Sequence, residues 1–185
     1  REQFDSMVEG PDVQELIDGG YLAKYRAFAP PNDLDLSGIH TVAGDYDKSE
    51  LEQRVSKPTI TGSAVGEYLK TCPDAPAIAF CISVNHAEAV AQKFRDAGVP
   101  SYSVDGSMPK EMRRTRIGGL ANGSIRVLTS CELVSAGLDI PAVAAAIMIR
   151  PTKSLSMYRQ QVGRALRPMD GKTAIILDHV RNIEN

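Results

Sequence analysis

The sequence predicts an α/β protein with a mostly parallel central sheet that is covered by helices on both faces. From residue 77 onward, short apolar runs alternate with amphipathic segments, an order typical of βαβ units. The apolar runs are continuous, as expected for strands that are buried on both faces. Composition agrees, since 43% of the 185 residues are hydrophobic and 24% are charged. This balance is that of a globular protein with a sizeable core.

Strands and helices are expected to alternate between residues 77 and 179. The predicted strands lie at 77–84, 100–106, 124–130, 142–150 and 172–179. The predicted helices between them lie at 86–98, 109–123 and 154–167. In parallel sheets, ligands bind beyond the carboxyl ends of the strands. We therefore expect ligand-binding residues in the loops that follow Val84, Asp105, Ser130 and Arg150.

The first 60 residues differ from this regular part. They predict a short helix that ends at Gly19 and Gly20, a strand that ends at Pro30, and a helix near 47–55. We expect residues 1–60 to form a leading or interdomain segment whose helix and strand pack on the core. Residues 61–185 are then the main domain. The opening lacks an initiator Met, as expected for a piece of a longer protein.

Charge and cysteine content exclude several classes of function. The formal net charge is −2, so any contact with nucleic acid must come from a local basic face. The three cysteines are widely spaced and form no Cys-x-x-Cys pair, so no metal site is expected. The chain has no apolar run of membrane-spanning length and no signal-peptide pattern. We expect a cytoplasmic protein.

Gly171, Lys172 and Thr173 match the tail of a phosphate-binding P-loop. A complete P-loop has a first Gly five positions before the Gly of its Gly-Lys-Ser/Thr sequence, and a helix follows it. Here Leu166 stands at that first position, and a predicted strand follows Thr173. We therefore predict a β-turn at these residues, and no ATP hydrolysis by this chain alone.

The helix before this turn carries the strongest chemical pattern. Gln160, Arg164 and Arg167 recur at i, i+4 and i+7, so they share one helical face. Gly163 removes a side chain beside them and permits close approach of a ligand or backbone. Arginine presents a planar fork of donors that suits phosphate oxygens, so the group predicts a polyanion clamp. An ordinary solvated helix face is the alternative.

A turn follows the strand at 124–130 and carries a second candidate. Gly137 can adopt a positive φ, and it presents Asp139 as an acceptor for a ribose hydroxyl. The alternative is that Asp139 only forms the turn before Pro141.

The ends of two predicted strands carry the remaining candidates. Ser83 and Asn85 follow one strand, while Ser130 and Cys131 end another. All four lie where a ligand is expected to bind, although Asn85 is equally suited to cap the next helix. His86 has no metal-type partners, and we give it no catalytic role.

Three blocks together carry a family resemblance. In order and spacing, "AIAFCISVNHA", "VLTSCELVSAGLDIP" and "QQVGRALRP" resemble motifs IV, V and VI of the second RecA-like domain of superfamily 2 helicases. The leading and trailing segments further resemble DEAD/DEAH-type helicases of phages and prophages, and more distantly the RadD-type DNA repair helicases. The resemblance implies a RecA-like three-layer α/β/α domain.

The resemblance also implies roles for the candidates. Arg164 and Arg167 would act as arginine fingers on ATP, which a preceding N-terminal RecA-like domain of the same protein binds with Mg²⁺. The implied nucleotide-binding residues are Gln160, Gly137, Asp139 and Gly163. Ser83, Ser130 and Cys131 would lie along the nucleic-acid track, although the family often has Thr where Cys131 stands. Ala136 replaces the Arg of DEAD-box members, which favours DNA over RNA.

Two alternatives stay open. The first is a non-catalytic RecA-like module that holds nucleic acid or a protein. The second, a small Rossmann-like enzyme, is disfavoured because no Gly-x-Gly-x-x-Gly follows a strand. A basic cluster at Lys110, Arg113, Arg114 and Arg116 is either a phosphate-contacting ridge or, more simply, a solvated helix face.

Overall fold

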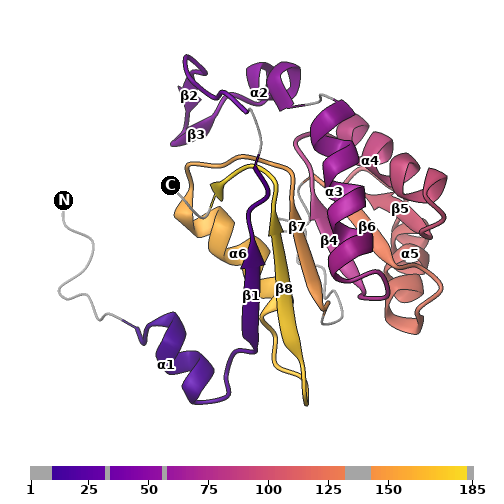
Figure 1. Ribbon diagram of the computed structural model, residues 1–185. Coiled ribbons are helices and arrows are strands. Elements are labelled where there is room, and N and C mark those ends of the chain that lie inside the picture. The colour runs from indigo at the N-terminus through magenta and orange to yellow at the C-terminus, as the bar shows by residue number, and fades with distance from the viewer. Residues whose placement is uncertain (1–9, 32–33, 56–57, 132–142, 183–185) are drawn as a thin grey trace.

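A computed structural model describes residues 10–31, 34–55, 58–131 and 143–182. Its centre is a six-stranded sheet in the order β1-β8-β7-β4-β6-β5, in which every neighbouring pair is parallel (Figure 1). The strands are β1 (Lys24–Phe28), β4 (Ala77–Phe80), β5 (Ser101–Val104), β6 (Val127–Ser130), β7 (Ala145–Met148) and β8 (Thr173–Asp178). The predicted parallel α/β sheet is therefore confirmed.

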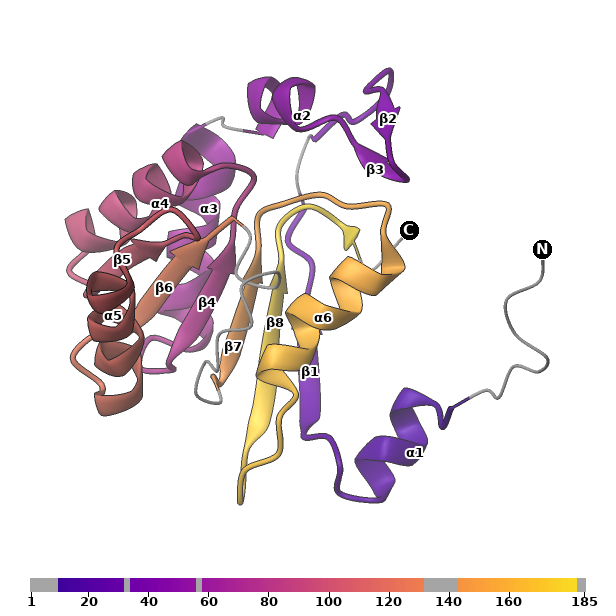
Figure 2. The same cartoon turned by 180° about the vertical axis from the view of Figure 1, so that it is seen from behind.

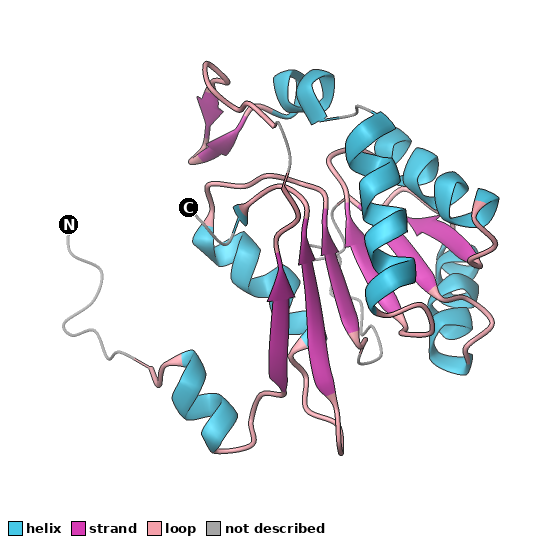
Figure 3. Ribbon diagram, viewed as in Figure 1, coloured by secondary structure: helices cyan, strands magenta, loops and turns pink. Residues whose placement is uncertain are grey.

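Helices cover both faces of the sheet and complete a three-layer α/β/α domain. The helices of one face are α3 (Pro58–Thr71) and α4 (Val84–Asp96), which contact each other and the strands. The helices of the other face are α5 (Lys110–Asn122) and α6 (Leu155–Ala165), as the reverse view shows (Figures 2 and 3). All residues of β4, β6 and β7 are buried, which explains why these strands read as continuous apolar runs.

The strand predicted at 77–84 is shorter than expected. It ends at Phe80, and α4 begins at Val84 with Ser83 as its N-cap. The Ser83 hydroxyl accepts a hydrogen bond from the His86 backbone N–H at 3.1 Å. The suggestion that Asn85 caps this helix was wrong, since Asn85 lies exposed in the first turn. The predicted strand end was too late because Ile82 is apolar and buried but does not belong to the strand.

The leading segment adds elements to the core. Strand β1 extends the sheet beside β8, in register from Lys24 opposite Thr173. Helix α1 (Val13–Asp18) has a capping box at Asp12 and Glu15 but buries no residue. The remaining elements are β2 (Thr41–Val42), β3 (Asp45–Tyr46) and α2 (Lys48–Val55). They form a small lobe over the carboxyl ends of the central strands, here called the cap lobe, residues 40–55 (Figure 1).

The described residues contain neither a membrane-spanning helix nor a metal-binding cluster. No helix in these ranges has the length and apolar character needed to cross a membrane. Within the same ranges, no three His, Cys, Asp or Glu side chains group closely enough to hold a metal ion.

The buried His179 makes stability depend on pH. It follows β8, its backbone N–H donates to the Met148 carbonyl at 3.0 Å, and its side chain is only 2% exposed. Burial lowers its pKa from 6.5 to about 4. As pH falls below 6.5, the unfolded chain therefore takes up a proton that the folded chain excludes. The free energy of unfolding declines across this window, by on the order of 3 kcal/mol at pH 4.

We predict that His179→Leu weakens this decline, measured by urea unfolding at about pH 7 and about pH 5. Part of the decline remains, because burial also lowers the pKa of His86. His40→Gln is the control, since the His40 side chain is 81% exposed. An equal decline in wild type and His179→Leu would contradict the prediction.

Candidate nucleotide and nucleic-acid site

The structure separates the candidate residues into two groups. Ser83, Asn85, Ser130 and Cys131 lie at or just after the carboxyl ends of β4 and β6. The candidates of the second group, on or after α6, are Gln160, Gly163, Arg164 and Arg167. Helix α6 runs back from the carboxyl ends toward the amino end of β1, where the Leu166 carbonyl accepts from the Ala23 N–H at 2.8 Å. Gly137 and Asp139 lie outside the described residues.

The strand-end group is partly engaged within the domain. Besides capping α4, the Ser83 hydroxyl donates a short hydrogen bond to the Glu52 carboxylate of the cap lobe. Ser130 is 1% exposed, and its hydroxyl finds no partner in the described part of the chain. The Ser130 carbonyl accepts from the Cys81 N–H at 2.7 Å, which joins the ends of β6 and β4. Cys131 is half-buried beside them.

Helix α6 places the second group along its length. Ser154 caps it by accepting from the Met157 N–H at 3.3 Å. Gln160 is exposed, and Arg164 lies half-buried in the last turn. A side-chain carbon built at Gly163 would meet no described atom within 4 Å, so packing inside this chain does not require glycine there. The α6 surface around Gly163 is therefore open to close approach from outside.

Arg167 does not belong to the helix. Helix α6 ends at Ala165 with Leu166 as its C-cap, so the expectation of one shared helical face holds only for Gln160 and Arg164. Pro168 explains the early end, since a residue before proline avoids helical geometry. Arg167 is half-buried and follows directly in the chain. Both arginines thus lie at the C-terminal end of α6, where positive charge also favours the helix dipole.

The Gly-Lys-Thr sequence forms the predicted turn. Gly171 has a φ of +69°, and the Lys172 N–H donates to the Met169 carbonyl at 3.1 Å. Thr173 then begins β8. The Lys172 ammonium donates to the Arg167 carbonyl at 2.9 Å, so it stabilises the chain between α6 and β8. Burial lowers the pKa of Lys172.

One tightly paired group was missed in the sequence. The Asp45 carboxylate of the cap lobe accepts from the Arg150 guanidinium at 3.0 Å, from the Thr152 hydroxyl at 3.0 Å and from the Lys153 N–H at 2.8 Å. The Arg150 and Asp45 side chains are only 6% and 14% exposed. These partners are more than 100 positions apart, so no local pattern signals them.

The parallel sheet with helices on both faces, together with a Gln-x-x-Gly-Arg-x-x-Arg sequence at the end of α6, defines a RecA-like domain of the superfamily 2 helicase type. The chain belongs to the family described as "Helicase conserved C-terminal domain", whose model matches residues 62–169. The matched part includes α3 to α6 and both groups of candidate residues that the structure describes.

Relatives with similar sequences agree with this family. The chain is 36% identical over 182 residues to the "51.5 kDa protein" of Lactococcus phage (isolate 7-9), covering 98% of the chain and 40% of that protein. It is 25% identical over 167 residues to "Putative ATP-dependent helicase IRC3" of Saccharomyces cerevisiae, covering 89% of the chain and 24% of that protein. The chain thus spans well under half the length of either relative.

Solved structures share the fold. A putative HsdR subunit of a type I restriction enzyme from Vibrio vulnificus matches with a TM-score of 0.69 at 21% identity, covering 89% of this chain and 33% of that one. The E. coli DEAD-box protein SrmB matches with a TM-score of 0.56 at 27% identity, covering 65% and 71%. The predicted RecA-like three-layer architecture is confirmed.

We predict that Lys172→Met leaves any ATPase activity of the full-length protein unchanged within about twofold, because the Lys172 ammonium is bonded to the Arg167 carbonyl and does not lie in a P-loop. The free energy of unfolding should fall by about 1 kcal/mol, the value of one hydrogen bond. The stability control is Lys70→Met, whose side chain is 78% exposed. Loss of ATPase activity in a folded Lys172→Met protein would instead support phosphate binding by Gly171, Lys172 and Thr173.

Proposed function

We propose that this chain is the C-terminal motor domain of an ATP-dependent helicase or translocase that acts on nucleic acid. It would supply arginine fingers to an ATP site that a preceding N-terminal RecA-like domain completes. The observation that carries the proposal is the pair Arg164 and Arg167 at the C-terminal end of α6, beside a glycine that internal packing does not require.

The chemistry of the candidate residues fits one half of a nucleotide site. Two guanidinium groups suit the oxygens of a polyphosphate. In this proposal the N-terminal RecA-like domain supplies the P-loop and the ligands of Mg²⁺. ATP would supply the phosphoryl group that is transferred to water. Arg164 and Arg167 would stabilise the charge that develops during this transfer, while Gln160 and Gly163 would contact the nucleotide beside them.

The other candidate group supports a nucleic-acid track. Ser83, Ser130 and Cys131 lie along adjacent strand ends, on the opposite edge of the sheet from the end of α6. Gly137 and Asp139 are proposed to contact the ribose of the nucleotide. This arrangement would let nucleotide and nucleic acid act on one rigid domain without competing for the same residues.

We propose DNA rather than RNA as the substrate. Ala136 stands where DEAD-box members carry Arg, which argues against that RNA-specialised branch. The test is stimulation of ATPase activity in the full-length protein by single-stranded DNA and by RNA of equal sequence and length. Stronger stimulation by RNA would overturn the choice of DNA and leave the motor assignment intact.

We predict that Arg164→Ala and Arg167→Ala each lower the nucleic-acid-stimulated ATPase rate of the full-length protein by at least about 100-fold. Arg164→Lys should lose most of the activity too, because an ammonium cannot replace a guanidinium fork. The matched control is Arg159→Ala, since Arg159 is exposed on the same helix. The fragment alone should hydrolyse no ATP.

Unchanged turnover in both alanine variants would refute the arginine fingers. If the full-length wild-type protein binds nucleic acid but never hydrolyses ATP, the non-catalytic module is the better description.

A further inference from the structure

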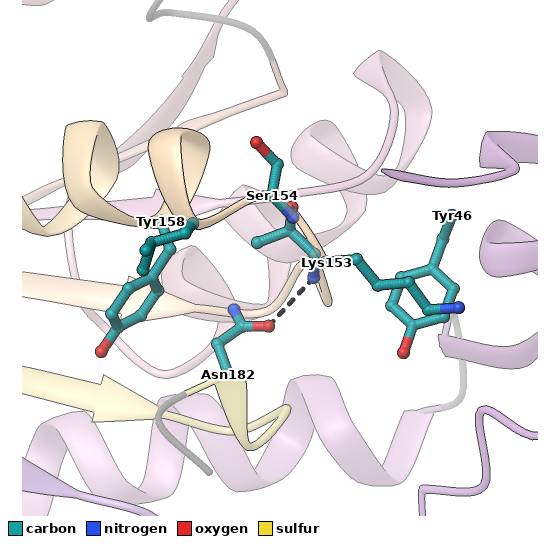
Figure 4. Close-up of a pocket in the computed structure, with 7 residues that line it drawn as sticks. Tyr46, Lys153, Ser154, Tyr158 and Asn182 are labelled. Atoms are coloured by element: carbon teal, nitrogen blue, oxygen red, sulfur yellow. Dashed lines mark hydrogen bonds between the residues drawn. The ribbon is translucent and has the colours of Figure 1, made fainter. Parts of the chain in front are cut away.

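A pocket of about 270 Å³ opens between the cap lobe and the beginning of α6, at the carboxyl ends of β7 and β8. It lies on the opposite edge of the sheet from the end of α6 that carries Arg164 and Arg167. Its lining combines the polar side chains of Lys153 and Asn182 and the rings of Tyr46 and Tyr158 with the apolar Leu155. Figure 4 shows the two tyrosine rings on either side of Asn182, with both hydroxyls directed to the same side of the view.

Hydrogen-bond donors without full partners gather in this pocket. The Lys153 ammonium donates to the Thr41 hydroxyl at 3.1 Å and lies 4.7 Å from the centre of the Tyr46 ring. An ammonium has three N–H groups, so donors remain. The phenol side chains of Tyr46 and Tyr158 also line the pocket, on opposite sides of Asn182. Burial raises the pKa of both, that of Tyr158 to about 12, so they remain O–H donors.

Two carboxylates near the pocket, those of Asp45 and Asp178, are either paired with a cation or buried in the sheet. No carboxylate of the described residues lines it. Asp45 lies behind the lining, but it is neutralised by Arg150 and accepts from Thr152 and the Lys153 backbone. Asp178, which acts on Tyr158, is fully buried in the sheet and accepts from the Val180 N–H at 3.2 Å. A lysine beside a phenol, with no facing carboxylate among the described residues, suits a singly charged anion of phosphodiester type.

The pocket also continues the row of strand ends that carries the nucleic-acid candidates. In the sheet, β7 lies between β4 and β8, and the Ile149 N–H donates to the Phe80 carbonyl at 3.1 Å. Neighbouring strands are about 4.8 Å apart, so the ends of β7 and β8 lie within about 10 Å of the end of β4. A nucleic-acid strand that passes Ser83 can therefore reach Lys153 along the carboxyl ends of the β-strands.

We propose that this pocket binds a backbone phosphodiester of single-stranded nucleic acid, with the neighbouring Lys153 and Tyr46 as its donors. It would extend the track from the ends of β6 and β4 to those of β7 and β8. This inference rests on the proposed function, because it takes the same strand as its ligand.

The test uses the full-length protein and a fluorescein-labelled single-stranded oligonucleotide, with binding followed by anisotropy over a range of salt concentrations. We expect Lys153→Ala to weaken binding by about 5- to 10-fold, and to lower the slope of log affinity against log salt by about one ion. The matched control is Lys93→Ala, because Lys93 is exposed in the last turn of α4, away from the strand ends. Tyr46→Phe keeps the ring and should weaken binding by a few-fold.

A second measurement replaces single phosphodiesters with neutral methylphosphonates. At the position held by the pocket, wild type and Lys153→Ala should bind the neutral strand equally. If wild type binds the strand but Lys153→Ala keeps its affinity and salt slope, the pocket assignment is wrong and the proposed function stands. The pocket assignment is also wrong if Lys153→Ala abolishes stabilisation by inorganic phosphate but leaves nucleic-acid binding unchanged. If wild type neither binds nucleic acid nor responds to it in ATPase assays, the proposed function itself fails.

Discussion

The parallel arrangement of the sheet decides where the described candidate residues lie. Parallel neighbours cannot be joined by a tight turn, so each connection must return along a face of the sheet, usually as a helix. All carboxyl ends consequently meet at one edge, while the C-terminal ends of the connecting helices meet at the other. Residues just after a strand and residues at the end of a helix are thereby separated. Ser83 and Ser130 fall on the first edge, and Arg164 falls toward the second.

This separation gives the two halves of the proposed function different surroundings. The strand-end edge is covered in part by the cap lobe, which is attached at Asp45 and again at Glu52. The Asp45–Arg150 pair is nearly dry, so removing one partner would leave an uncompensated buried charge, a loss of about 3–5 kcal/mol. The cap lobe is thus fixed to the loop that carries Lys153, and both must be considered as one surface.

Much of the fold could be predicted from the sequence, because periodicity and glycine or proline boundaries are local signals. The five strands and three helices expected after residue 77 all exist. The turn at Gly171 to Thr173 was predicted because the first Gly and the following helix of a P-loop are both missing there. Errors arose where a local signal had two meanings. Ile82 is apolar and buried but lies outside the strand, and Arg167 follows the periodicity of a helix that Pro168 ends early. Asp45 could not be predicted, since its partners lie more than 100 residues away.

The candidate arginines also show why one domain alone is an incomplete site. A guanidinium that stabilises a transition state must face phosphate in a water-excluded space, because electrostatic interactions are weak in bulk solvent. Here Arg164 and Arg167 are half-buried at a helix end, and the space beside Gly163 is open to solvent. A second surface must close over this end of α6 before the arginines can act at full strength. Closure of that kind would make hydrolysis depend on the distance between two domains. Such a dependence is what couples nucleotide turnover to movement along a strand in the proposed motor.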